Sequence, residues 1–317
     1  MIKFGNNTHS IIRSCIAAAM VVFIGTSPSF GQETKKDDKP VSNTFFSGTF
    51  LENQTYITNG KNVWEFIINH RFGKISDGSK LAWGVYSPSN IRLEVNYGIR
   101  KNLQIGIGAT KNNKLADGSI KWGIFQQTKS GKKPVSLTYF GNFAYRGDPT
   151  SAFANPGFKE AHRFSYFHEL LIAYKFCDYF NLQVAPMFAH YNLVEASNPL
   201  VPAGGDSTAV PVRSNNNFGL SVLGKLNINP TLSFLFEFDN NFTKLKIPEN
   251  DTYKNPKPTI ALGLEKATSA HSFQLFITTA DGIVYQKNMV YNQNNFAKKD
   301  GVKSGLAIGF NITRVFY

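Results

Sequence analysis

Two histidines and one asparagine have side chains of the types that hydrolytic catalysis could use. His190 and Asn192 lie two residues apart, and His168 lies in a preceding segment with a similar pattern. A histidine that is oriented by an asparagine can act as the base for a serine nucleophile. We find no serine on a neighbouring segment that would face the same side at the same depth as either histidine. The simpler interpretation is that the histidines lie at a membrane interface without a catalytic role.

A second set of candidates consists of charged side chains that alternate with apolar ones. In a strand, residues at alternate positions point to the same face. Seven of these side chains are basic and six are acidic, and this near balance favours a network of ion pairs over an ion-selective surface. The thirteen residues, which we predict to line a lumen, are Glu65, Arg71, Arg92, Glu94, Lys121, Arg146, Arg163, Glu169, Lys175, Lys225, Glu237, Asp239 and Glu265.

The hairpin predicted at residues 91–110 shows the kind of element that must position these side chains. Leu93 and Val95 alternate there with Arg92 and Glu94, and the alternation resumes after a short polar turn. A period of two indicates strands with one apolar face and one polar face. The same unit of about ten residues recurs down to the end of the sequence, which is the signature of a transmembrane β-barrel.

Twelve such strands are predicted, and the connections between them alternate in length. Short connections of three to seven residues alternate with longer ones, although the one predicted at 111–118 is barely longer than its neighbour at 128–134. This alternation predicts a transmembrane antiparallel β-barrel of about 12 strands, with short periplasmic turns and long outer loops. The predicted strands are 63–73, 91–99, 103–110, 119–127, 135–146, 163–176, 182–193, 217–226, 231–242, 259–266, 272–279 and 304–316.

Closure of this sheet follows from the cost of unpaired backbone groups. Each unmatched N–H or C=O group costs several kcal/mol in hydrocarbon, so only a closed barrel can span the bilayer with strands. The last strand ends with Phe316 and Tyr317. This ending resembles the C-terminal signal by which outer-membrane barrels are recognised, and it implies the barrel-assembly machinery as a partner.

The N-terminal part of the sequence indicates export. Residues 1–31 combine Lys3 and Arg13 with an apolar core at 16–24, and we expect signal-peptide cleavage near Gly31/Gln32. That core is about half of the ~20 residues that a spanning helix needs. Residues 32–61 then form a periplasmic leader or a small plug segment, and the barrel domain occupies 62–317.

The charge and cysteine content of the chain indicate which classes of partner to expect. The chain has 34 basic and 21 acidic residues, a net charge of +13 that falls to +11 when the signal peptide is removed. No basic helix or zinc-ligand spacing suggests nucleic acid, so the basic loops are expected to face outer-membrane lipids and lipopolysaccharide. Cys177, the only cysteine of the mature chain, has no nearby metal-ligand pattern. We expect no metal and no cofactor.

Several motifs together resemble an uncharacterised family of Gram-negative outer-membrane β-barrels, defined only as a domain of unknown function. They are INHRFG at 68–73, RLEVNYG at 92–98, LQVAP at 182–186 and ITRVF at 312–316. The resemblance covers residues 43–317 and implies a fold and a location without an established activity. It also implies that His70, Arg71 and Gly73 lie where the first strand leaves the bilayer and brace the outer rim.

The sequence thus predicts a non-enzymatic outer-membrane barrel that is either a narrow solute channel or a structural or binding barrel. Barrels of this size lie between side-chain-filled eight-stranded barrels and open porins. One alternative is an outer-membrane lipid hydrolase using His190 or His168, similar to the phospholipases that place a Ser-His-Asn group on a barrel of about twelve strands. A further alternative is a secreted soluble β-protein that binds sugar, if the aromatic faces form a sandwich core.

Overall fold

The computed structural model describes residues 38–42, 44–153, 157–194, 214–244, 255–280, 282–297 and 304–317. The predicted signal peptide with its cleavage site and residues 32–37 of the predicted leader lie outside these residues. Twelve strands are present: β1 (Trp64–Lys74), β2 (Asn90–Arg100), β3 (Leu103–Thr110), β4 (Leu115–Phe125), β5 (Ser136–Arg146), β6 (Phe164–Lys175), β7 (Phe180–Tyr191), β8 (Asn216–Asn229), β9 (Leu232–Asn241), β10 (Thr259–Ala267), β11 (His271–Thr278) and β12 (Ala307–Phe316).

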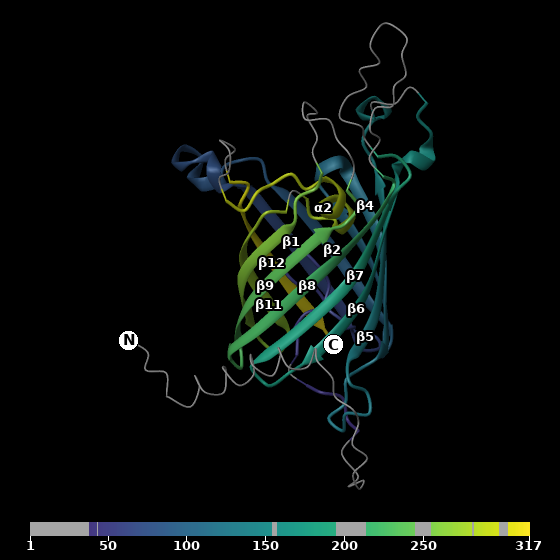
Figure 1. Ribbon diagram of the computed structural model, residues 1–317, viewed down its shortest axis with the longest axis vertical. Coiled ribbons are helices and arrows are strands. Elements are labelled where there is room, and N and C mark those ends of the chain that lie inside the picture. Colours follow the sequence, from purple (N-terminus) through teal and green to yellow (C-terminus); the bar gives the residue numbers. More distant parts are fainter. Residues whose placement is uncertain are drawn as a thin grey trace, which may run out of the picture.

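The strands form one closed barrel in which each strand pairs antiparallel with its neighbours in sequence (Figure 1). β1 closes the barrel against β12, so Ile68 lies between Leu93 of β2 and Ile312 of β12. This arrangement confirms the predicted antiparallel barrel of about twelve strands. A closed barrel also rules out the sandwich core on which the soluble sugar-binding alternative depended.

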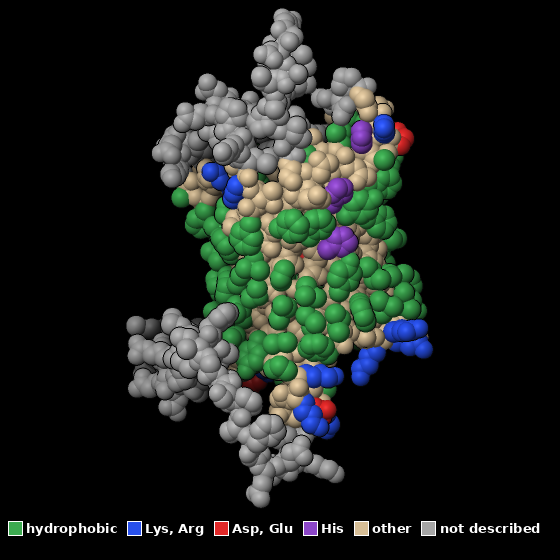
Figure 2. Space-filling view, turned by 45° about the vertical axis from the view of Figure 1, so that its right-hand side comes forward, with side chains coloured by type: hydrophobic (Ala, Val, Ile, Leu, Met, Phe, Trp, Pro, Cys, Tyr) green, Lys and Arg blue, Asp and Glu red, His purple; other side chains and the backbone are tan. Residues whose placement is uncertain are grey.

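Residues alternate between the lumen and the outer surface along every strand. On β1, for example, Glu65 and Asn69 are buried, whereas Trp64 is exposed on the outside. Figure 2 shows the result on one face of the barrel, a band of hydrophobic side chains with Lys and Arg gathered toward its two ends. An outward apolar band with a polar interior is the pattern expected of a strand-built membrane protein.

The two ends of the barrel differ in their connections. β2–β3, β6–β7, β8–β9 and β10–β11 are joined by four or fewer residues at one end, here called the turn end. The opposite end carries most of the long loops and is called the outer end, because barrels of this kind carry their long loops outside. The short 3-10 helices are η1 (Ile75–Asp77), η2 (Ser79–Gly84), η3 (Asn112–Lys114), η4 (Thr150–Ala152) and η5 (Glu160–Arg163).

The β3–β4 connection is shorter than the sequence predicted. β4 begins at Leu115 instead of residue 119, so this outer connection has fewer residues than the β4–β5 connection at the turn end. The alternation of polar and apolar residues does not show in this part of the sequence, because the outward-facing residue is Gly118, which has no side chain. The Phe143 ring of β5 covers it, and a Cβ atom there would lie only 2.5 Å from that ring.

The last outer connection contains a helix that the sequence analysis treated as loop. α2 (Tyr285–Tyr291) lies in the outer mouth of the barrel (Figure 1), and Tyr285 packs edge-on against Phe140 of β5. Tyr285, Met289 and Val290 join the buried core cluster. Within the described part of the chain, no helix is long and apolar enough to cross a membrane.

Candidate functional site

The first feature of the candidate site is a segment inside the lumen. Residues 44–59, here called the plug, enter from the turn end, where Pro40 pairs with Thr128. The plug folds back on itself: Thr49 pairs with Gln54, and Phe50 N donates to Asn53 O at 2.8 Å. The side chain of Leu51 at the tip is fully buried. The plug therefore belongs to the core of the barrel.

One ion pair fastens the tip of the plug to β1. Arg71 donates from Nε to Glu52 Oε1 at 2.8 Å and from Nη2 to Glu52 Oε2 at 2.9 Å. The two side chains are only 7% and 1% exposed. Arg71 also donates to the backbone oxygen of Leu51 at 2.9 Å and lies over the ring of Phe276. Arg71 thus holds the plug from inside, and it does not brace the rim as the family resemblance implied.

Other strands bind the plug mainly through the backbone groups of the plug. Lys121 Nζ donates to Gly48 O at 2.8 Å, and Asn311 Nδ2 donates to the oxygens of Phe50 and Leu51 at 2.9 Å. Gln183 accepts from Tyr56 N. Further hydrogen bonds come from Gln104, Thr138, Ser221, Glu237, Gln274 and Thr313. Nine of the twelve strands therefore hold the plug directly, counting β1 through Arg71.

A second group of buried ions lies in the barrel wall. Arg92 donates to Asp117 at 2.6 and 2.9 Å and to Glu94. Lys225 donates to Glu265 at 2.9 Å. Asp117 was missed because the sequence analysis placed it in a loop. Its only sequence signal is its place two residues before Ser119 in the same inward series.

The structure separates the thirteen predicted lumen residues into four groups. Arg146 and Arg163 lie at the outer mouth, and Lys175 lies at the turn end, where it donates to Ser42 O. Asp239 is half-buried on β9. The nine that are buried in the wall are Glu65, Arg71, Arg92, Glu94, Lys121, Glu169, Lys225, Glu237 and Glu265. Because three of the seven cations lie at the ends and Asp117 joins the acids, the buried wall is acidic and not balanced.

Glu169 is a buried acid whose carboxylate lacks hydrogen-bond donors in the described part of the chain. Neither of its carboxylate oxygens has a hydrogen-bond partner among the described residues, and it lies in register between Phe140 and Met187. We expect Glu169→Leu to stabilise the fold by about 1–3 kcal/mol, because an unsatisfied buried polar group is replaced by an apolar one. Unfolding in detergent by heat or denaturant measures this. Glu65→Leu is the control and should destabilise, since Glu65 accepts from Asn59 and Asn96.

The predicted rim residues lie at the outer half of β1. The His70 ring faces outward and stacks on Phe310 of β12, with ring centroids 4.8 Å apart. Gly73 lies where the β1–β2 loop folds back, because a Cβ atom there would lie 2.2 Å from Ser87. This close approach explains the glycine of the HRFG motif.

Of the three hydrolase candidates, His190 and Asn192 contact each other, whereas His168 has a different partner. His190 Nε2 lies 3.1 Å from Asn192 Oδ1, and His190 Nδ1 lies 2.7 Å from Asn216 Oδ1. His168 instead contacts the Tyr139 hydroxyl at 2.7 Å. Among the described residues, no serine hydroxyl is hydrogen-bonded to either histidine. The same residues contain no group of three His, Cys, Asp or Glu side chains that could hold a metal ion.

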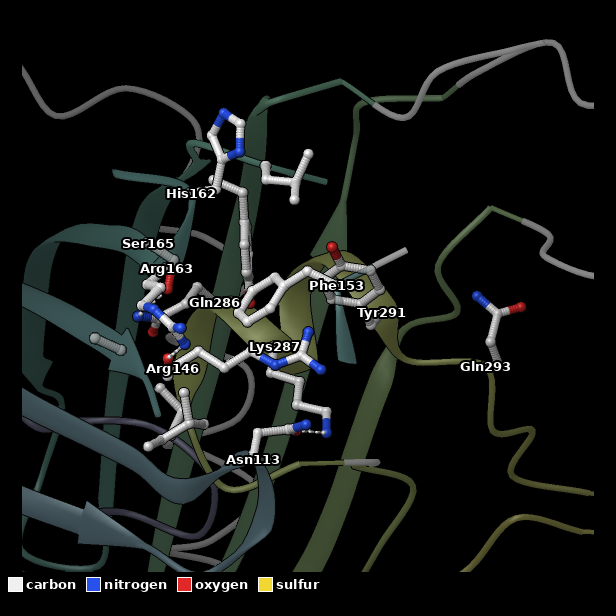
Figure 3. Close-up of a pocket in the computed structure, with 15 residues that line it drawn as sticks. Asn113, Arg146, Phe153, His162, Arg163, Ser165, Gln286, Lys287, Tyr291 and Gln293 are labelled. Carbon is white, nitrogen blue, oxygen red and sulfur yellow. Dashed lines mark hydrogen bonds between the residues drawn. The ribbon is translucent and has the colours of Figure 1, made fainter. Parts of the chain in front are cut away.

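A cavity opens at the outer mouth above α2, and we call it the outer cavity. Its volume is about 280 Å³, and Figure 3 shows its labelled side chains. It is lined by Asn113, Leu115, Ala144, Arg146, Phe153, His162, Arg163, Ser165, Tyr191, Leu193, Val284, Gln286, Lys287, Tyr291 and Gln293. Most of these residues belong to loops or α2, where no period of two could reveal them.

The cations of the outer cavity are held by aromatic and acidic neighbours. The guanidinium carbons of Arg146 and Arg163 lie 4.4 and 5.2 Å from the centre of the Phe153 ring. Arg146 Nε pairs with Asp148 at 2.7 Å. Burial raises the pKa of Asp148, but hydrogen bonds from Asn113 and Arg146 outweigh burial and lower that pKa below its ordinary value. Asp148 is thus an anion that fixes the position of Arg146.

Several solved structures are similar to this chain at low sequence identity. The COG4313 outer membrane channel from Pseudomonas putida F1 is 9% identical, with 82% of this chain and 97% of that chain covered and a TM-score of 0.47. Omp33 from Acinetobacter baumannii is 10% identical, with 81% and 99% covered and a TM-score of 0.37. LpxR from Salmonella typhimurium is 10% identical, with 80% and 100% covered and a TM-score of 0.37. Similarity at this level does not bear on activity.

Sequence comparison identifies the family. No curated protein matches the chain. A family model described as a membrane-bound β-barrel domain of unknown function matches residues 45–316, which include most of the plug and all but the last residue of the barrel. The resemblance noted in the sequence is therefore confirmed, and the chain is a membrane-bound β-barrel protein. This chain belongs to the membrane-bound β-barrel family DUF5777.

Proposed function

We propose that this protein is a non-enzymatic binding barrel, closed by its own plug, that takes up a small solute at its outer mouth. The observation that carries the proposal is the plug, which occupies the middle of the lumen and is hydrogen-bonded to nine strands. An open solute channel would need that space. The sequence left open a narrow channel and a structural or binding barrel, and the plug favours the second.

The energy needed to displace the plug supports this proposal. Breaking a buried ion pair such as Arg71–Glu52 costs about 3–5 kcal/mol by itself. Displacement would also expose Phe50 and Leu51, each worth about 1.5–3 kcal/mol of burial. Since a difference of 1.4 kcal/mol is a factor of ten in population, spontaneous opening should be rare.

The geometry around the histidines supports the non-enzymatic part of the proposal. The two ring nitrogens of His190 lie 2.7 and 3.1 Å from the side-chain oxygens of Asn216 and Asn192, so asparagine side chains occupy both sides of the ring. A serine nucleophile would have to displace one of them before it could transfer a proton. No observation on the described residues favours the lipid hydrolase alternative.

Conductance across a planar lipid bilayer tests the proposal. We expect the purified, refolded protein to insert without producing discrete current steps, because the plug blocks the lumen. Heat-modifiable migration in detergent gels must first show that the inserted sample is folded. Reproducible steps from the unmodified protein would instead establish a channel. In that case, neutralising Arg92 or Glu94 should change the step size if these residues line the pathway.

A further inference from the structure

Charge distinguishes the outer cavity from the rest of the interior. Arg146, Arg163 and Lys287 line it, and none of its lining residues is acidic. Asp148 neutralises Arg146 at 2.7 Å, whereas the partner of Arg163, Glu160, has a side chain that is 72% exposed. The Arg163 side chain is only 9% exposed, but water screens a pair whose acidic partner is so exposed, and the pair is weak. The cavity therefore keeps a positive potential that attracts anions.

Two of the cations are positioned from different elements. Arg163 ends η5 on the β5–β6 loop and donates to the backbone oxygens of Arg146 and Asp148 at 3.0 and 2.6 Å. Lys287 projects from α2, and its Nζ donates to Asn113 Oδ1 at 3.1 Å (Figure 3). Arginine presents a planar set of donors that matches a phosphate group, and lysine adds a point charge. An anion between them would be bound by two loops at once.

Neutral groups of the cavity fit a hydroxylated ring. Gln286 is 1% exposed, and its Nε2 donates to Asn142 and Ser165, but its Oε1 has no hydrogen-bond partner among the described residues. A ligand hydroxyl would satisfy this oxygen, since a buried acceptor without a donor is costly. Tyr191 and Tyr291 contact each other edge to face, with centroids 5.3 Å apart, and add aromatic surface to the lining.

We propose that the outer cavity binds a small sugar that carries a phosphate group. The cations would contact the phosphate, Gln286 would accept from a sugar hydroxyl, and the tyrosines would contact the ring. The volume of about 280 Å³ lies at the lower limit of ligand pockets, which suits one sugar unit. This inference rests on the proposed function and gives its solute a chemical class.

Calorimetric titration of the full mature protein in detergent tests the inference. We expect saturable binding of glucose 6-phosphate, with glucose and inorganic phosphate each binding at least tenfold more weakly. Lys287→Gln should weaken binding of glucose 6-phosphate at least tenfold. Lys80→Gln, the same charge change on a different outer loop and outside the cavity, should leave it unchanged.

Two sources of such a ligand can be told apart in the same assay. Competition by lipid A in mixed micelles would identify phosphorylated sugars of the outer leaflet as the source. Binding of glucose 6-phosphate without such competition would identify a free solute. Both results support the inference.

The inference fails if glucose binds as tightly as glucose 6-phosphate, if Lys287→Gln binds normally, or if no titration saturates. It also fails if Lys80→Gln and Lys287→Gln weaken binding equally, because the effect would then be general charge. Current steps from the unmodified protein would contradict the proposal of a plugged barrel but not the proposal of a ligand site in the outer cavity. An electrically silent protein that binds no glucose 6-phosphate would contradict only the proposed ligand site.

Discussion

Deletion of residues 44–59 is expected to turn an electrically silent barrel into one that conducts in discrete steps. The plug fills the middle of the lumen, and twelve strands enclose more space than the eight-stranded barrels that side chains alone can fill. Because α2 still occupies the outer mouth, we expect small steps instead of the large conductance of a porin. Planar-bilayer recording of the deletion variant beside the unmodified protein measures the difference.

The sign of the selectivity is a second readout of the same variant. Without Glu52, the buried wall keeps four cations and six acids in the described strands. A lumen with excess negative charge concentrates cations, so a salt gradient should give a reversal potential of a cation-selective pathway. Anion selectivity would contradict this account of the wall. Silence from a deletion variant that is shown to be folded would mean that α2, and not the plug, closes the barrel.

The strands could be predicted because the alternation of inward and outward residues is visible in the local sequence. Where an inward polar residue alternates with an outward apolar one, as in β2 and β3, the predicted and observed bounds agree within one residue. The pattern failed at β4 because Gly118 takes its apolar cover from Phe143 of another strand. A covering side chain that comes from a distant part of the sequence leaves no trace in the local period.

For the same reason, the sequence offered a plug only as one of two alternatives for residues 32–61 and did not predict the outer cavity. The plug sequence has no period, and its partners Gln183 and Asn311 lie more than a hundred residues away. The cavity joins Arg163 to Lys287, two loop residues that only the closed barrel brings to one mouth. The alternation of polar and apolar residues predicted that Arg71 points into the lumen, but this pattern did not predict Glu52 as its partner.

Arg71→Met is expected to lower the free energy of unfolding by about 3–5 kcal/mol. Methionine keeps contact with Phe276 but leaves Glu52 buried and without its cation. It also removes the donor to Leu51 O at the plug tip. Denaturant unfolding of the folded variant in lipid vesicles, compared with the unmodified protein, measures the loss.

A double-mutant cycle with Glu52→Gln decides whether the ion pair is the cause. If it is, Arg71→Met combined with Glu52→Gln should be more stable than Arg71→Met alone, because no uncompensated buried charge remains. Lys175→Met is the matched control: its partner Asp178 has a side chain that is 85% exposed, so we expect a loss of at most about 1 kcal/mol. Equal losses from Arg71→Met and Lys175→Met would show that the plug is held by its backbone hydrogen bonds and apolar contacts, with little help from the buried pair.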